Sequence, residues 1–278
     1  MTWQIFFEGF AVRAYLAAAV VGLAAPVIGS FLVQRRLSLI GDGVGHLAFA
    51  GVAIGVALGL APVWGALAVA VMGALVLERL RRSGRLAGDI SLALIFYFGI
   101  ALGVVVLSVT GKFDASALGV LFGSPIVTTW PEIVVIVLLC LLVVGVAALF
   151  YKELLAVALD EETARASGLP VDRLNALLVV LTALLVAAGM RVVGLLLIAA
   201  LLVVPVAAGS RLAHSFRGAM FWAIGAGVVS ALFGLVIALG QGSIEPGGTI
   251  VLTSIVVFVV ATLAGRRAAA RHPRRTPS

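Results

Sequence analysis

Two residues that could bind a metal ion, Asp42 and His46, stand four positions apart in a sequence that is otherwise largely apolar. If residues 39–59 form a helix, side chains four positions apart project from one face, one turn from each other. A carboxylate and an imidazole on one face can share a divalent transition-metal ion. The pair therefore predicts a metal-binding position on this helix.

Two ligands would leave such a site incomplete, because zinc usually takes about four ligands and manganese more. The remaining ligands would come from a second copy of the chain, from backbone carbonyls or from water. An incomplete shell suits an ion in transit, because a fully enclosed ion would not leave. The alternative is structural: Asp42 is an interfacial acid held by Arg35 or Arg36, and the pair forms a polar seam between packed helices.

The helix that carries this pair must pack closely, because it is rich in glycine. Two glycines precede His46 at an interval of four, and three more follow at the same interval. This spacing of small residues lets membrane helices approach each other closely. The glycines predicted to pack are Gly41, Gly45, Gly51, Gly55 and Gly59.

Composition indicates an all-α integral membrane protein. Of the 278 residues, 63% are hydrophobic and 11% are charged, and the apolar residues form blocks of about twenty, the length of a membrane-spanning helix. Such blocks leave no room for a soluble catalytic domain, and the chain has no Walker-type phosphate-binding loop. Energy for transport must therefore come from another polypeptide or from an ion gradient. The single Cys140 excludes an internal disulfide framework.

We expect one transmembrane domain, residues 1–278, forming a polytopic bundle of about nine helices. Eight is the alternative, because only Met190 and Arg191 separate the sixth span from the seventh. The predicted spans are Ala11 to Val33, Leu39 to Gly59, Pro62 to Leu77, Ser91 to Val109, Thr128 to Phe150, Leu174 to Met190, Val192 to Ser210, Gly218 to Leu239 and Thr249 to Gly265.

The basic residues predict the orientation of the bundle. With nine spans, sixteen of the nineteen Lys and Arg residues fall on one side, which the positive-inside rule makes the cytoplasm. The N-terminus then lies outside and the basic C-terminal tail, residues 266–278, lies inside. The net charge of +7 thus reflects membrane topology, and no nucleic-acid partner is expected. Only Arg13, Lys112 and Arg191 fall on the outer side.

Two segments between spans have their own patterns. Residues 110–125, on the outer side, are moderately apolar and contain several glycines, as a short interfacial or re-entrant helix would. Residues 151–173, on the inner side, contain a short predicted surface helix. Asp160 is its expected N-cap, Glu161 and Glu162 fill its first turn, and Gly168 followed by Pro170 ends it. A structured elbow between two spans predicts a cytoplasmic partner.

Four stretches together resemble the permeases of ATP-binding-cassette importers of zinc, manganese or iron. The match covers nearly the whole chain, and the last two stretches are also distantly similar to vitamin B12 and siderophore permeases. The stretches are Arg36-Leu-Ser-Leu-Ile-Gly-Asp-Gly-Val-Gly-His46, Leu121-Phe-Gly-Ser124, Asp160-Glu-Glu-Thr-Ala-Arg-Ala-Ser-Gly-Leu-Pro170 and Val193-Gly-Leu-Leu-Leu-Ile-Ala-Ala-Leu-Leu-Val-Val-Pro205.

The resemblance implies a multi-pass permease of the prokaryotic plasma membrane that carries a divalent metal and holds no permanent cofactor. It implies a homodimer, two copies of a separate cytoplasmic ATPase and an extracytoplasmic metal-binding protein. Asp42 and His46 would line the ion pathway. The residues expected to couple the permease to the ATPase are Asp160, Glu161, Glu162, Ala164, Arg165 and Gly168. The outer loop 240–249 departs from the family pattern, so no role is transferred to Glu245.

Three other functions are alternatives to a metal-ion permease. A permease for a metal chelate of the siderophore or corrinoid type shares the same resemblance. An intramembrane protease would need a His-Glu-x-x-His motif or a second intramembrane aspartate, and the sequence shows neither. An ion-gradient carrier would show internal repeats and several buried acids. Activity of this chain without an ATPase would favour a carrier or a protease.

Overall fold

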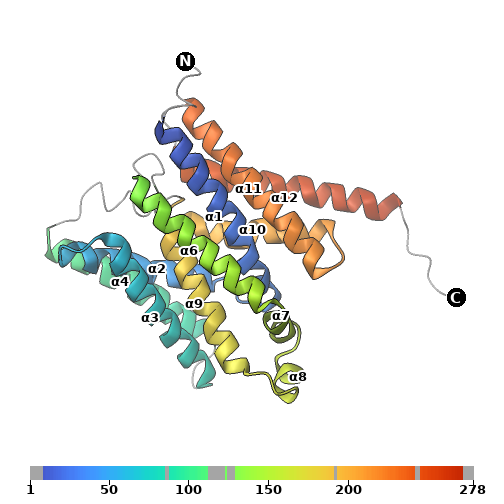
Figure 1. The fold of residues 1–278 in the computed structure, drawn as a ribbon, viewed down its shortest axis with the longest axis horizontal. Coiled ribbons are helices and arrows are strands. Elements are labelled where there is room, and N and C mark those ends of the chain that lie inside the picture. The colour runs from blue at the N-terminus through green and yellow to red at the C-terminus, as the bar shows by residue number, and fades with distance from the viewer. Residues whose placement is uncertain are drawn as a thin grey trace.

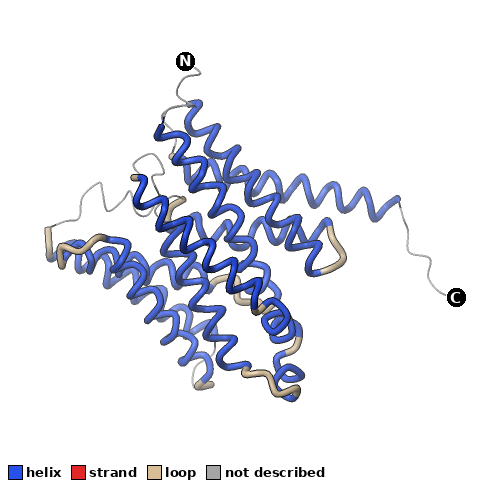
Figure 2. Tube along the Cα trace, viewed as in Figure 1, coloured by secondary structure: helices blue, strands red, loops and turns tan. Residues whose placement is uncertain are grey.

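A computed structural model describes residues 9–84, 88–111, 123, 129–190, 193–241 and 245–271. In these parts every regular element is an α-helix (Figure 2). Most of the predicted outer helix at 110–125, and the last seven residues of the tail, lie outside the described residues. The helices are α1 Gly9–Gln34, α2 Ile40–Ala57, α3 Pro62–Arg82, α4 Gly88–Val109, α6 Trp130–Leu149, α7 Tyr151–Leu159, α8 Glu161–Ala166, α9 Val171–Gly189, α10 Leu195–Leu212, α11 Phe216–Gln241 and α12 Pro246–Arg271.

Each of the nine predicted spans coincides with one of these helices. Eight of the described helices are long and apolar enough to cross a membrane, and α10 contains a shorter apolar stretch, Leu197–Leu212. Helix α3 extends five residues past its predicted end at Leu77, to Arg82. Its last turn carries three arginines, which suit the negative end of a helix dipole.

Helices α1 and α2 are the most buried of the candidate spans, and α1 lies between α6 and α11 (Figure 1). Helix α2 lies between α3 and α4, while α1 packs against α6, α10 and α11. In an apolar 18-residue stretch of α1 and of α2, 72% and 78% of the residues are buried. In the corresponding stretches of α3, α4, α6 and α12, only 28% are buried. The helix that carries Asp42 and His46 is therefore the most enclosed of the candidate spans.

Glycine sets the close contact between α2 and α3. A methyl group on Gly51 would overlap the carbonyl oxygen of Gly65 in α3, and one on Gly65 would overlap that of Gly51. Gly55 makes ordinary van der Waals contact with the same stretch of α3. On the other side of α2, methyl groups on Gly41 and Gly45 would meet leucine side chains of α10.

Gly59 differs from this expectation, because it lies beyond the end of α2 and no atom stands near its missing side chain. Its φ is +71°, a conformation that glycine adopts without strain. The Leu60 N–H donates to the Gly55 carbonyl (2.9 Å) and the Gly59 N–H to the Val56 carbonyl (3.3 Å). These two bonds form a Schellman motif, so Gly59 ends the helix rather than packing it.

Candidate functional site

His46 is buried at the crossing of α2 and α4. Its side chain is 6% exposed, and its ring lies edge-on to Phe96 of α4, with ring centres 4.2 Å apart. Helix α4 comes this close because residue 99 is glycine: a Cβ there would stand 2.6 Å from the His46 carbonyl carbon. In the described part of the chain, the buried Nδ1 of His46 has no hydrogen-bond partner.

A buried ring nitrogen without a partner is energetically costly, typically by about 1–3 kcal/mol. That cost disappears when the nitrogen binds a proton donor or a metal ion. The arrangement around His46 is therefore suited to a ligand that binds transiently, as the sequence predicts for an ion in transit.

Asp42 lies one turn earlier, in the first turn of α2, where the helix dipole favours a carboxylate. It is half-buried and lines a cavity of about 230 Å³ between α2 and α4. Phe96 lines this cavity and also contacts His46, so one aromatic ring borders both predicted ligands. The other lining residues are Leu39, Leu92, Ala93 and Tyr97.

The structural alternative for Asp42 required Arg35 or Arg36 as its partner. Among the described residues, no ion pair within 4.0 Å includes Asp42. The Arg35 side chain instead binds Glu161 and Asn175. The predicted ion pair of Asp42 with Arg35 or Arg36 is therefore wrong for the described structure.

One subunit does not supply a complete metal site in the part that the structure describes. No group of three or more His, Cys, Asp and Glu side chains comes together there. Asp42 and His46 thus offer two ligands at most, and any further ligands must be backbone oxygens, water or side chains from elsewhere.

The predicted elbow consists of two helices. Helix α7 extends from the end of α6, and the six-residue α8 follows it (Figure 1). Asp160 caps α8, as predicted: its carboxylate accepts hydrogen bonds from the Thr163 hydroxyl (2.6 Å), the Glu162 N–H (3.0 Å) and the Thr163 N–H (3.1 Å). These bonds, led by that from the Thr163 hydroxyl, hold the pKa of Asp160 below its usual range.

Gly168 ends α8 with a φ of +84°. The N–H groups of Gly168 and Leu169 donate to the carbonyls of Arg165 (3.1 Å) and Ala164 (3.2 Å), which is again a Schellman motif. The short helix is therefore defined at both ends by its own sequence. Residues 171–173, which the prediction included in the elbow, already belong to α9.

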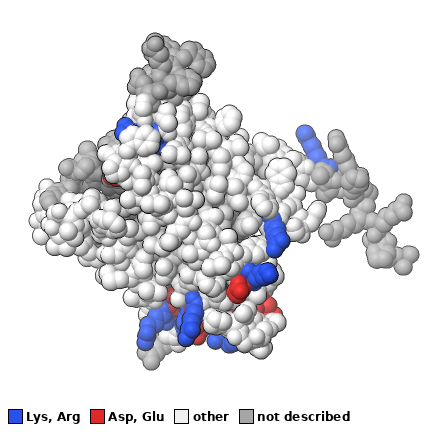
Figure 3. Space-filling model, viewed as in Figure 1, with Lys and Arg blue, Asp and Glu red and all other residues white. Residues whose placement is uncertain are grey.

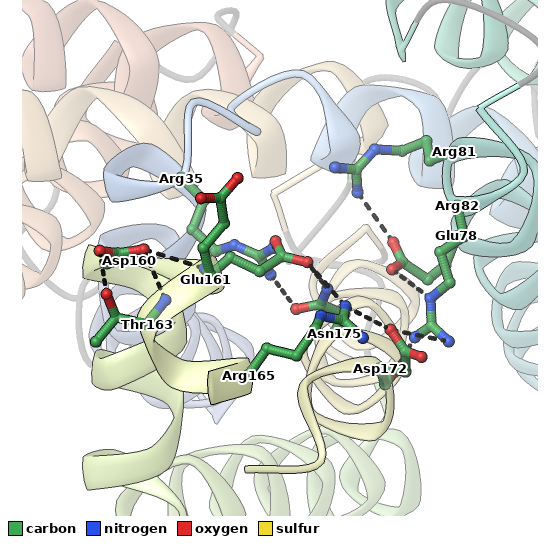
Figure 4. A network of polar contacts seen from close by, with 11 residues as sticks. Arg35, Glu78, Arg81, Arg82, Asp160, Glu161, Thr163, Arg165, Asp172 and Asn175 are labelled. Atoms are coloured by element: carbon green, nitrogen blue, oxygen red, sulfur yellow. Dashed lines mark hydrogen bonds and ion pairs between the residues drawn. The ribbon is translucent and has the colours of Figure 1, made fainter. Parts of the chain in front are cut away.

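A polar network fixes α8 to the bundle (Figure 4). The Arg35 guanidinium, at the end of α1, donates to Glu161 Oε2 (2.8 Å) and to Asn175 Oδ1 (2.6 Å). Asn175 Nδ2, on α9, donates in turn to Glu161 Oε1 (3.3 Å). Glu161 is thus held from two helices, the distant α1 and the neighbouring α9.

The network continues to α3. Arg165 donates to Asp172 Oδ1 at 3.0 Å, and Asp172 also accepts from Arg82 through its backbone carbonyl. Arg82 and Arg81 both bind Glu78, which is 4% exposed, at 3.0 and 2.9 Å. Charged groups therefore connect α1, α3, α8 and α9 at one end of the bundle. Figure 3 shows most of the charge on the visible face gathered at this end.

Two of the predicted coupling residues are engaged in contacts within the chain. Ala164 is 4% exposed and packs against the chain itself, and the Glu161 carboxylate is bound by Arg35 and Asn175. Ala164 is therefore covered by the chain itself in this structure, and its part in coupling stays a prediction. The exposed residues of the elbow include Glu162, Arg165, Gly168 and Leu159, which is 63% exposed.

Sequence reasoning missed Arg35, Asn175 and Glu78. The spacing of Glu78 from Arg81 and Arg82, three and four residues, is that of ion pairs along a helix and could have identified that part of the network. No local signal predicts the bonds of Arg35, because its partners lie 126 and 140 residues away.

Comparisons with known proteins agree with this arrangement. A family model described as the ABC 3 transport family matches residues 8–265. The chain is 29% identical over 255 residues to the manganese transport system membrane protein MntC of Listeria innocua, covering 92% of this chain and 90% of that protein. It is 27% identical over 247 residues to the high-affinity zinc uptake system membrane protein ZnuB of Haemophilus influenzae, covering 89% and 94%.

A solved structure has the same fold as this chain. The chain superimposes on PsaBC from Streptococcus pneumoniae, solved in complex with Fab, with a TM-score of 0.85 and 26% sequence identity. The match covers 97% of this chain and 98% of the solved one. The arrangement of helices described above is therefore shared over nearly the whole length of both chains.

Proposed function

Since the chain belongs to the ABC 3 transport family, whose members are membrane permease subunits and not enzymes, we propose that it imports manganese or zinc into the cytoplasm. The proposal includes ferrous iron as a cargo, because carboxylate and imidazole ligands suit all three ions. Relatives named for manganese transport and for zinc uptake support this substrate class. As a multi-pass protein of the bacterial inner membrane, the chain needs a separate ATPase to drive transport.

The observation that carries the proposal is the environment of His46 and Asp42. Inside the most enclosed span, a buried imidazole with an unpartnered nitrogen lies one turn from a half-buried carboxylate that has no ion pair in the described structure. Ionisable groups inside a membrane are expensive and mark ion pathways. The carboxylate supplies charge to a partly dehydrated cation, and the imidazole favours transition metals over calcium and magnesium.

A second copy of the chain would complete the coordination. The cavity beside Asp42 borders Tyr97, which is 69% exposed on α4, so the cavity lies next to an uncovered face of the bundle. A two-fold partner packed on this face would bring a second carboxylate and imidazole close to the first pair. Four ligands, two from each subunit, match the number that zinc usually takes, about four. The permease is accordingly proposed to be a homodimer.

A bare ion is the preferred cargo over a metal chelate. The cavity beside Asp42, about 230 Å³, is smaller than the sites of roughly 300–1,000 Å³ that typically hold organic ligands. A delivering protein on the outer side would therefore release the metal itself into the pathway.

Helices α7 and α8 are proposed to meet the ATPase. The exposed residues Glu162, Arg165 and Gly168 would contact the ATPase. Asp160, which caps α8, and Glu161, which binds Arg35, would hold the helix in place. Because Glu161 and Arg165 connect α8 to α1, α3 and α9, a displacement of α8 would be transmitted to three helices at once. Two elbows, one per subunit, fit two copies of the ATPase. The N-terminus would lie outside and the C-terminus in the cytoplasm.

The test replaces each pathway ligand with a side chain of similar size. Asp42→Asn and His46→Gln should assemble with the ATPase and reach the membrane, but uptake of radioactive manganese and zinc should fall at least tenfold. Glu245→Gln, an acid just before α12, is the control and should transport normally. Wild-type uptake by both pathway variants would make Asp42 and His46 structural. Uptake by the permease expressed without any ATPase would instead identify a carrier.

A further inference from the structure

A groove of about 810 Å³ lies on the bundle, remote from the Asp42 cavity, between α1, α6 and α11. Helices α6 and α11 both pack against α1, so α1 forms the floor and the other two form the walls. The floor consists of Leu23, Val27 and Phe31. The walls are apolar too, with Val144, Ala147 and Ala148 on one side and Met220, Phe221 and Ile224 on the other.

Polar groups gather only at the end of the groove next to α7. Lys152, Glu153 and Arg217 line this end together with Tyr151. The Arg217 guanidinium carbon lies 5.1 Å from the centre of the Tyr151 ring, which is a cation–π contact. Among the described residues, neither basic side chain has an acid within ion-pair distance, and the buried Tyr151 hydroxyl has no hydrogen-bond partner.

An aromatic cluster packs behind these polar groups and fixes the Tyr151 ring. The rings of Phe31, Tyr151 and Phe216 pack on one another, with centres 5.3 to 6.2 Å apart. Tyr151 therefore cannot easily turn to find another partner for its hydroxyl. Two cations without acidic partners are therefore left at the end of an apolar groove, in a bundle whose helices are long enough to span a membrane.

We propose that this groove binds a phospholipid with an anionic headgroup. The acyl chains would lie along α1 between α6 and α11, where only apolar side chains contact them. A phosphate oxygen would accept hydrogen bonds from Lys152 and Arg217. Basic pockets between membrane helices on the cytoplasmic side are known to bind such headgroups. Glu153 contributes one opposing charge, so the end of the groove has a net charge of one positive unit.

Free phosphate would satisfy the same polar groups but would leave the apolar walls empty. The length of apolar groove therefore favours a lipid over the free anion as the source of the phosphate. Bound lipid would also brace α7, the segment that connects the membrane helix α6 to the elbow helix α8.

The test is native mass spectrometry of the purified full-length chain in detergent. It would be titrated with phosphatidylglycerol, with phosphatidylcholine of the same acyl chains, and with inorganic phosphate. Phosphatidylglycerol should bind most tightly. The double variant Lys152→Gln, Arg217→Gln should weaken that binding about thirty-fold, as expected for losing two basic groups near an anionic lipid.

Two further variants separate the headgroup from the chains. Arg79→Gln together with Arg173→Gln removes two exposed arginines outside the groove and should leave lipid binding unchanged. Ala148→Trp fills the apolar wall and should weaken phosphatidylglycerol and phosphatidylcholine alike. Equal binding of phosphatidylglycerol to wild type and to the Lys152, Arg217 double variant would overturn the proposal. So would inorganic phosphate competing fully with the lipid, because the acyl chains would then contribute nothing.

Discussion

The substitution Glu161→Gln tests whether the polar network holds the elbow on the bundle. The change keeps the shape of the side chain and removes the charge that Arg35 contacts at 2.8 Å. The Arg35 side chain is only 9% exposed, and burial lowers its pKa while the Glu161 charge opposes that shift. Without the carboxylate charge, the buried guanidinium has only neutral acceptors, the Asn175 amide oxygen and the amide oxygen of the new glutamine.

The structure sets the size of the effect. Removing one partner of a fully buried ion pair costs about 3–5 kcal/mol. The Glu161 side chain is 43% exposed, however, so water already screens its charge and the cost must be reduced. We expect a loss of about 1–2 kcal/mol, confined to α8 because this helix carries its own caps at Asp160 and Gly168.

Hydrogen exchange measures such a local loss. The amides of Ser167 and Leu169 donate within the elbow at 2.9 and 3.2 Å and report its opening. They should exchange roughly 5- to 30-fold faster in Glu161→Gln than in wild type, the factor that corresponds to the expected free energy. Arg35→Gln added to Glu161→Gln should speed exchange little further, because both changes break the same Arg35–Glu161 ion pair.

Glu162→Gln is the matched control, because Glu162 is the next residue on the same helix and is exposed. It should leave exchange in α8 unchanged. Equal acceleration by the two glutamine variants would show that the helix depends on its charge in general. An unchanged rate in Glu161→Gln would show that the network does not hold the elbow. Either result would refute the reasoning above.

Two further predictions concern packing and capping. Gly51→Ala should lower the melting temperature of the purified protein by several degrees, because its methyl group would overlap the Gly65 carbonyl, while Gly145→Ala, at a helical glycine with open space, should not. The pKa of Asp160 is lowered in the folded elbow, so the ionised carboxylate stabilises α8 at pH values above its unfolded pKa of about 3.9. This stabilisation should be lost as the pH falls through the lower pKa of the folded state. Hydrogen exchange of α8 from pH 6 to pH 3 should show this loss in wild type and a flat profile in Asp160→Asn; Thr163→Val, which removes the hydroxyl donor, should move the loss to higher pH.

The sequence by itself determined the position of the long apolar helices, although it left their number at eight or nine and did not predict α7. A span needs about 20 apolar residues, so blocks of that length identify it without knowledge of its neighbours. Helix ends follow from equally local rules. Asp160 caps α8 and Gly168 ends it through bonds to residues no more than five positions away. The pairing of Asp42 with His46 likewise follows from their separation on one helix.

Only the tertiary structure decided how each residue is used. Gly51 and Gly59 stand at the same spacing, yet Gly51 meets the backbone of α3 and Gly59 ends the helix, because α2 stops at Ala57. Ala164 looked available for a partner and is buried. Arg35 was a candidate neighbour of Asp42, but helix packing brings it to Glu161, 126 residues away. Such contacts depend on where distant segments meet, and no spacing along the chain contains that information.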